Sequence, residues 1–235
     1  MITWNAQGSH GMNVPAVAAA ILRHEPDVVL LQEVQRRQLG ELHVAMGATD
    51  ARWRFKHWGV KIPAEGLGVV SMVPLDRVHH QVLAHRWQFW NWRRRVAIHF
   101  GVEVGGVLVR CVDVHLGAGV PHAERVRQAR DLLRAAPNAG LIGGDLNAEP
   151  NSDELAAFAE SGWRDAERRL HGHTPAPRTN WATGPRNEPP MQRLDYLLVP
   201  DAVEVLEAFV PDDWPTWANL SDHVPVVARL RFARR

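Results

Sequence analysis

Cysteine and lysine are both scarce in this 235-residue chain: it holds one cysteine, and among its 27 basic residues only Lys56 and Lys61 are lysines. Cys111 has no partner for an internal disulfide, and its place in the apolar run 107–114 predicts a buried thiol rather than a nucleophile or a metal ligand. The formal net charge is only +1, which indicates no overall electrostatic attraction to nucleic acid. Any basic binding surface must therefore be local.

Long apolar runs, flexible linkers and internal repeats are also missing from the sequence. No stretch approaches the roughly 20 apolar residues that a membrane-spanning helix needs, and the strand expected at 1–7 leaves no room for a signal peptide. No Gly/Ser-rich segment divides the chain, so we expect one domain over residues 1–235. The default expectation is a monomeric cytoplasmic protein, or a secreted one whose export signal has been removed.

Hydrophobic periodicity predicts an alternation of strands and helices. Helices are expected near 13–25, 35–46, 121–136 and 152–160. Strands are expected near 1–7, 27–33, 52–60, 67–73, 77–84, 94–104, 106–115, 139–144, 193–199, 203–210 and 223–231, with Gly105-Gly106 as a hairpin turn. The region 168–191 is rich in Pro, Arg, Thr and Asn and is expected to be a long loop. Packing sheet on sheet with helices outside would bury these elements.

The most informative motif is the segment 143–150, Gly-Gly-Asp-Leu-Asn-Ala-Glu-Pro, which follows an apolar strand. Side chains alternate along a strand, so Asp145 and Asn147 are expected on one face at its mouth. A carboxylate there can take a proton from water while the amide holds that water or the substrate. Asp and Asn beside Gly and Pro also form ordinary turns, so the motif alone is weak evidence.

Similar polar groups follow other predicted strands. They are Asn5, Gln32-Glu33, His115, Asp195 and the pair Asp222-His223. Each has a simpler interpretation as a solvated carboxylate, a structural histidine or a turn. Their repetition at strand ends is what indicates a site.

In this order, Asn, Glu, His, Asp-x-Asn, Asp and Asp-His, the residues resemble the endonuclease/exonuclease/phosphatase superfamily, and the resemblance runs from Asn5 to His223. It implies a four-layer α/β sandwich, with two packed, mainly antiparallel β-sheets flanked by helices and the active site at one edge. The superfamily includes pancreatic-type deoxyribonucleases, AP endonucleases, sphingomyelinases and inositol-polyphosphate 5-phosphatases.

The resemblance and the chemistry of the residues together suggest roles. Glu33 is the expected principal ligand of Mg²⁺, with Mn²⁺ as an alternative ion, and Asn5 and Asp222 would complete or support that site. Asp145 would position or deprotonate the attacking water, and Asn147 would hold the phosphate or that water. His223 would donate to the phosphate, with Asp195 orienting it and stabilising its charge.

His115 separates the branches of the superfamily, because AP endonucleases carry an aromatic hydroxyl where Val-His-Leu-Gly stands here. The motif is similar to the deoxyribonuclease-like and sphingomyelinase-like members, in which this histidine stabilises or protonates the leaving oxygen. Glu65, just before Gly66-Leu67-Gly68, is a candidate to orient His115.

Aromatic and arginine residues alternate in 86–95, and Arg93, Arg95, Trp90 and Trp92 are the predicted substrate-binding residues there. Arg neutralises phosphates and Trp stacks on bases, although the same composition suits a lipid headgroup region or a simple packed loop. Asn180 and Trp181 are further expected substrate contacts from the Arg-rich region 164–193.

The sequence thus predicts a Mg²⁺-dependent phosphodiester hydrolase, with a DNA endonuclease of the deoxyribonuclease-like branch as the leading interpretation and nucleic acid as its substrate. A lipid phosphodiesterase or phosphoinositide phosphatase, which would bind a phospholipid headgroup, is the enzymatic alternative. A binding module that has the fold but no turnover is the third.

Overall fold

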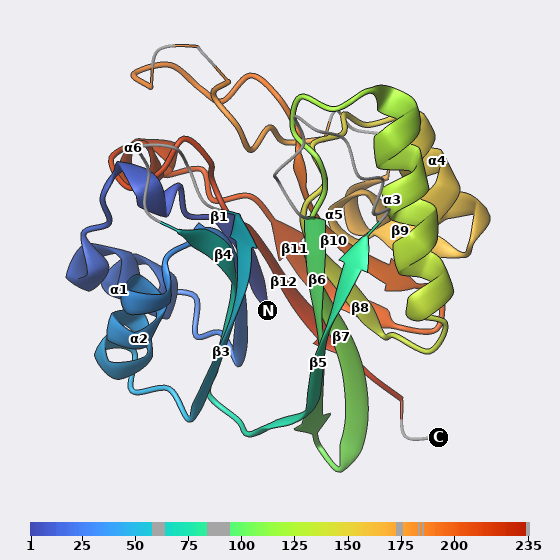
Figure 1. Cartoon of the computed structure of the whole chain (residues 1–235), viewed down its shortest axis with the longest axis horizontal. Coiled ribbons are helices and arrows are strands. Elements are labelled where there is room, and N and C mark those ends of the chain that lie inside the picture. The colour runs from blue at the N-terminus through green and yellow to red at the C-terminus, as the bar shows by residue number, and fades with distance from the viewer. Residues whose placement is uncertain (58–63, 84–94, 173–175, 183, 185, 234–235) are drawn as a thin grey trace.

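The computed structural model describes residues 1–57, 64–83, 95–172, 176–182, 184 and 186–233. Its strands form two six-stranded sheets that pack against each other (Figure 1). In spatial order the first sheet contains β11 (Glu204–Phe209), β12 (Val226–Arg231), β1 (Ile2–Asn5), β2 (Val28–Val34), β4 (Glu65–Ser71) and β3 (Asp50–His57). The second contains β5 (Leu75–Leu83), β6 (Arg95–Val104), β7 (Val107–His115), β8 (Leu141–Asp145), β10 (Asp195–Pro200) and β9 (Trp163–Asp165).

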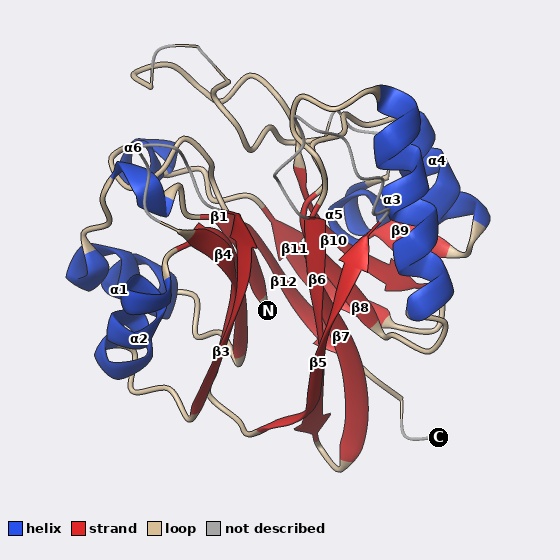
Figure 2. Cartoon of the chain, viewed as in Figure 1, coloured by secondary structure: helices blue, strands red, loops and turns tan. Residues whose placement is uncertain are grey.

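Helices cover the outer faces of both sheets, which produces the predicted four layers (Figure 2). The first sheet is covered by α1 (Val14–Leu22) and α2 (Arg36–Ala45), and the second by α3 (His122–Ala135) and α4 (Asp153–Glu160). The shorter elements are η1 (Gly8–His10), α5 (Ala166–His171) and α6 (Trp214–Ala218). None of the described helices has the length and apolarity to cross a membrane.

Three apolar clusters hold these layers together. One joins α1 and α2 to the first sheet, one fills the space between the sheets, and one joins the second sheet to α3 and α4. In the first cluster, the rings of Trp4 and Trp217 meet edge to face with centroids 5.4 Å apart. Such a pair adds about 0.5–1.5 kcal/mol beyond the burial of its surface.

Both sheets follow one connection pattern. A parallel pair lies at the centre of each, β1 and β2 joined through α1 in the first sheet, and β7 and β8 joined through α3 in the second. The other pairings among the described strands are antiparallel, which confirms the prediction of mainly antiparallel sheets. Parallel neighbours end at the same edge of a sheet, so each pair brings two carboxyl-terminal ends together.

Two glycines explain why Gly-Gly precedes Asp145. Gly144 has φ +152°, and a Cβ atom on it would lie 1.8 Å from the Val114 carbonyl oxygen. A Cβ on Gly143 would lie 2.5 Å from Leu30 Cδ1, which belongs to the facing sheet. At Gly144 the contact is with backbone, so only glycine fits, whereas at Gly143 it is with the end of a side chain. This part of the motif therefore serves packing directly beneath the strand end.

The structure differs from the predicted elements at β9, α5, α6 and the start of β12. The loop predicted over 168–191 in fact begins with helix α5, which follows the unpredicted strand β9. Asp165 caps α5 by accepting the Glu167 amide and forms an ion pair at 3.2 Å with Arg193, a partner too distant in sequence to predict locally. Helix α6 was not predicted either. The last strand begins at Val226 rather than 223, because Pro225 has no N–H for a sheet ladder.

Candidate active site

Strand ends meet at one edge of the sandwich. Asn5, His115 and Asp145 are the last residues of β1, β7 and β8. The parallel register places His115 beside Asp145, and Asn5 Nδ2 donates to Asp145 Oδ2 across the two sheets at 3.0 Å. Glu65 and Asp195 begin the antiparallel strands β4 and β10, which start at this edge. Strand order therefore gathers polar residues that are far apart in the sequence.

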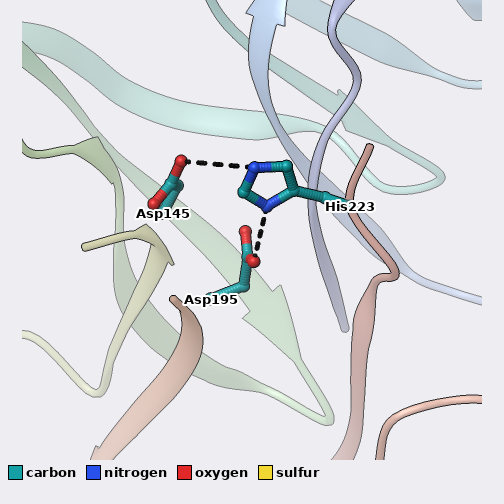
Figure 3. A group of neighbouring side chains, drawn as sticks. All are labelled: Asp145, Asp195 and His223. Atoms are coloured by element: carbon teal, nitrogen blue, oxygen red, sulfur yellow. Dashed lines mark hydrogen bonds and ion pairs between the residues drawn. The ribbon is translucent and has the colours of Figure 1, made fainter. Parts of the chain in front are cut away.

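His223 lies between two buried carboxyl groups (Figure 3). Its Nδ1 is 2.7 Å from Asp195 Oδ2, and its Nε2 is 4.0 Å from Asp145 Oδ2. If Nδ1 carries a proton, it donates to Asp195, which fixes the ring and directs Nε2 towards Asp145. The three side chains thus form a connected acid–base group.

Burial and charge shift two pKa values in this group. Burial raises the pKa of Asp145 to about 7, and the charge of Asp195 adds to the rise. Burial lowers the pKa of His223, but the charge and hydrogen bond of Asp195 outweigh burial and raise it to about 10. Asp145 can therefore exchange a proton near neutral pH, while His223 carries a positive charge.

Lys56 is a site residue that the sequence analysis missed. It lies near the end of β3, is 1% exposed, and places Nζ 2.7 Å from His115 Nδ1 and 3.6 Å from Glu33 Oε1. Burial lowers its pKa to about 8, although the Glu33 carboxylate acts in the opposite direction. The alternation of Arg52, Arg54 and Lys56 resembles the solvent face of a strand, so no local signal marks Lys56 as buried.

A polar layer lies below the strand ends. Gln32 Nε2 donates to Asp113 Oδ1 at 2.7 Å and to Thr3 Oγ1 at 3.2 Å, and all three side chains are completely buried. Burial raises the pKa of Asp113 well above its usual range, while the hydrogen bond from Gln32 acts in the opposite direction. Because the layer links β1, β2 and β7, it holds the strands that end at Asn5 and His115 in register.

The sequence profile described as "Endonuclease/Exonuclease/phosphatase family" matches residues 2–223. The match includes each strand end that carries the polar group just described. The chain belongs to the endonuclease/exonuclease/phosphatase family. No curated protein matches it.

Solved structures of other proteins share the fold. The catalytic domain of human Nocturnin, solved with a bound sulfate anion, is 22% identical, with TM-score 0.78 over 99% of this chain and 93% of that one. A 3′ phosphatase from Neisseria, solved bound to a product DNA hairpin, is 19% identical, with TM-score 0.72 over 98% of both chains. A mannosyl-6-phosphatase from Bacteroides thetaiotaomicron is 16% identical, with TM-score 0.75 over 98% of both chains. Family membership makes the chain a phosphoester hydrolase at the superfamily level, and these structures favour no branch.

Family resemblance predicts that Glu65 orients His115. In the structure Glu65 Oε1 accepts the Ser9 amide at 3.0 Å, and it is Lys56 Nζ that lies 2.7 Å from His115 Nδ1. Burial raises the pKa of Glu65, and the nearby charge of Glu33 raises it further. Orientation of His115 by Glu65 stays a prediction, whereas the Lys56 contact is an observed feature of this member of the family.

Asn147 reaches the site by a different geometry from the one predicted. Strand β8 ends at Asp145, and Asn147 has a left-handed φ of +48°, so strand alternation does not place its side chain. Its backbone amide donates to Asp145 Oδ1 at 2.9 Å, and its Nδ2 donates to the Leu116 carbonyl at 3.1 Å. The motif is therefore a turn that also holds the Asp145 carboxyl group.

The chain segments that carry the predicted metal ligands contact one another. Asn5 pairs with Gln32, the residue before Glu33, and Ser221, the residue before Asp222, donates its hydroxyl to the Asn5 carbonyl at 2.7 Å. The Glu33 side chain is 26% exposed, so a hydrated ion can reach it. Two carboxylates and an amide oxygen are the donors that Mg²⁺ and Mn²⁺ prefer, so these residues fit the cation that the family implies.

Three of the seven non-glycine residues that have a positive φ among the described residues lie close to these strand ends. Gln7 has φ +46° and Glu33 has φ +56°, both in the left-handed region that non-glycine residues seldom occupy. Each such conformation costs about 1–3 kcal/mol and is typical of functional sites. Together with Asn147, these residues surround the converging strand ends.

Asp145, Asp195 and His223 also have the spacing of a metal site, since one ligand atom from each lies within 4.8 Å of the others. Metal binding there would require loss of the proton that the pKa of about 10 keeps on His223. The hydrogen-bonded geometry suits proton transfer, and it also leaves Nε2 available to an ion because Nδ1 is the atom that contacts Asp195.

The predicted substrate contacts have mixed outcomes. Trp90, Trp92 and Arg93 lie outside the described residues. Arg95 is 5% exposed, and its Nη2 donates to the Ala118 carbonyl at 3.5 Å. A buried guanidinium of this kind is positioned to add charge from within the site rather than to form an exposed basic patch.

Asn180 and Trp181 are both buried. Asn180 Nδ2 donates to the Asp222 carbonyl at 3.3 Å, so it shapes the backbone beside the site. Trp181 is 1% exposed, belongs to the cluster under α1, and donates Nε1–H to the Glu188 carbonyl at 2.6 Å. The Trp181 ring therefore packs in the core, and its role as a substrate contact stays a prediction.

Proposed function

We propose that the chain is a Mg²⁺-dependent phosphodiester hydrolase that cleaves nucleic acid, in its specific form a DNA endonuclease. The proposal depends above all on Asp145, a 2% exposed carboxyl group that accepts from Asn5 and faces the charged ring of His223. Its raised pKa suits a group that accepts a proton from water at neutral pH. Mn²⁺ is expected to replace Mg²⁺.

In the proposed mechanism one group of residues would hold the cation and another would act on the attacking water. A cation held by Glu33, Asn5 and Asp222 would polarise a phosphoryl oxygen and offset charge that builds there. Asp145 would take the proton of the attacking water, and Asn147 would hold that water or the phosphate.

The two histidines would act on the phosphate and the leaving group. His223, kept charged by Asp195, would donate a hydrogen bond to a phosphoryl oxygen. His115 places Nε2 3.4 Å from Asp145 Oδ2 and would stabilise or protonate the leaving oxygen. Lys56 Nζ, which is 2.7 Å from His115 Nδ1 and 3.4 Å from Nε2, would position the His115 ring and balance the charge of Glu33.

Different phosphoesters fit the same machinery. The Neisseria relative was solved with a DNA product, which supports nucleic acid, whereas the Bacteroides thetaiotaomicron relative is named for a sugar phosphate. Lipid phosphodiesterases and phosphoinositide phosphatases of the family share the residues named here and remain the alternative. A non-catalytic binding module would have no use for a buried acid–base group.

One purified sample should be assayed against plasmid DNA, RNA, sphingomyelin, phosphoinositides and a sugar phosphate, with Mg²⁺ and with excess chelator. We expect Mg²⁺-dependent nicking of the plasmid and none in chelator. Turnover of a lipid or sugar phosphate without DNA cleavage would contradict the nucleic-acid substrate. Inactivity on every phosphoester would contradict hydrolysis itself.

The Asp195–His223 hydrogen bond predicts non-additive mutations. Asp195→Asn and His223→Ala should each lower kcat by about 10²–10⁴-fold, the range for loss of a positioned acid–base group. Because Asp195 acts through His223, the double variant should lose little more than the more severe single variant. Asp201→Asn, which changes an exposed carboxylate, is the control. Single-turnover kinetics that showed additive losses would mean that the two residues do not act as a pair.

A further inference from the structure

Arg186 is connected to Asp222 through the side chain of Gln7. Arg186 Nη2 donates to Gln7 Oε1 at 2.8 Å, and Gln7 Nε2 donates to Asp222 Oδ2 at 2.8 Å. Arg186 Nη1 donates to the Ala218 carbonyl at 3.2 Å, at the end of α6. The guanidinium is therefore held at two points although Arg186 itself is an exposed residue.

The two hydrogen bonds define which end of the Gln7 amide faces Asp222. A glutamine amide has one acceptor end and one donor end, whereas a guanidinium only donates and a carboxylate only accepts. If the amide turned over, its NH₂ group would face Arg186 and its oxygen would face Asp222, and both contacts would be repulsive. Arg186 thus ensures that a donor reaches the carboxylate.

Asp222 depends on this donor for its orientation. Its Oδ2 has the 2.8 Å bond from Gln7, while the Ser221 hydroxyl reaches Oδ1 only at 3.4 Å. Gln7, which makes this contact, has a left-handed backbone conformation with φ 46° and ψ 42°. Such a conformation is retained where the surrounding contacts support it.

We propose that Arg186, acting through Gln7, is a positioning residue for the Asp222 carboxylate and hence for the divalent cation. The inference rests on the proposed function, because it takes Asp222 as a ligand. Partners that orient a ligating group change metal affinity by about 10–100-fold when they are removed. Residues outside the catalytic motifs, in the segment 176–192, thereby help to set the Mg²⁺ requirement.

The test compares Arg186→Gln with Arg178→Gln, which removes the same charge from an exposed residue of the same segment. Mg²⁺ binding to the substrate-free protein should be measured by isothermal titration calorimetry. Arg186→Gln should weaken binding about 10-fold, and Arg178→Gln should leave it unchanged. At saturating Mg²⁺ the kcat of Arg186→Gln should return to the parent value. Parent-like Mg²⁺ affinity in Arg186→Gln would overturn the proposal.

A double-mutant cycle tests the route through Gln7. Gln7→Met has similar length but no amide, so adding Arg186→Gln to it should weaken Mg²⁺ binding no further. Independent losses would overturn a relay through Gln7. If the parent protein binds Mg²⁺ and Arg186→Gln binds it equally well, only this inference is contradicted. If the parent protein hydrolyses its substrate fully in chelator, the proposed metal-dependent function is contradicted.

Discussion

Asp145→Asn should lower kcat by about 10²–10⁴-fold, because the variant cannot take the proton of the attacking water. The change keeps the size of the side chain and retains an oxygen that can accept the Asn147 amide. The fold should persist, although Asn5 Nδ2 loses the acceptor that Asp145 Oδ2 provides. Burial raises the pKa of the Asp145 carboxyl group, so its ionised form is disfavoured in the folded protein, and a neutral amide avoids that penalty.

The measurement is single-turnover cleavage of the substrate that the panel identifies, paired with thermal unfolding. Asp212→Asn, at an exposed position, is the matched control for loss of one carboxylate. Parent-like turnover in a folded Asp145→Asn protein would exclude Asp145 as the base. A collapse in melting temperature would show instead that Asp145 is needed for structure.

Glu33→Gln should reduce Mg²⁺ affinity by more than about 100-fold, since removing a ligand should exceed the 10–100-fold effect of removing a partner that only orients one. Activity should fall in parallel and recover in part at high Mg²⁺. A second effect follows from Lys56, whose ammonium lies 3.6 Å from Glu33 and would lose a counter-charge while remaining 1% exposed. We therefore also expect a lower melting temperature.

The loss of Mg²⁺ affinity and the loss of stability can be measured separately. Glu25→Gln changes an exposed glutamate and should alter neither metal binding nor stability. In Glu33→Gln, adding Lys56→Met should restore part of the lost melting temperature without restoring Mg²⁺ affinity. Calorimetry that found parent-like Mg²⁺ affinity in Glu33→Gln would remove Glu33 from the metal site.

The architecture could be predicted because its signals are local. Alternation in 106–115 and the helical repeat in 121–136 correspond closely to β7 and α3. Helix α5 could not be predicted in this way, because its N-cap residue Asp165 forms a buried ion pair with Arg193, far along the chain. The strand connections that the two sheets share were not predicted either, because the two halves of the chain show no visible sequence repeat.

The site was predictable to the extent that its residues lie at strand ends. Asp145, Asp195 and His223 were expected to act together, and the structure brings them together. Lys56 was not expected, because its sequence pattern is that of a solvated strand face. Trp181, expected as a substrate contact, packs in the core, and its polar, Arg-rich sequence neighbourhood does not indicate this burial.

The shared connection pattern of the sheets gives the site a pseudo-twofold plan at the level of topology. β1 corresponds to β7, β2 to β8 and β4 to β10, so Asn5 is the counterpart of His115, Glu33 of Asp145, and Glu65 of Asp195. Two of these pairs are carboxylates in both halves, whereas Asn5 and His115 differ: in the proposed mechanism Asn5 and Glu33 hold the cation, and His115 and Asp145 move protons. The reaction centre would therefore lie at the seam between the halves, and neither half could carry out the proposed hydrolysis alone.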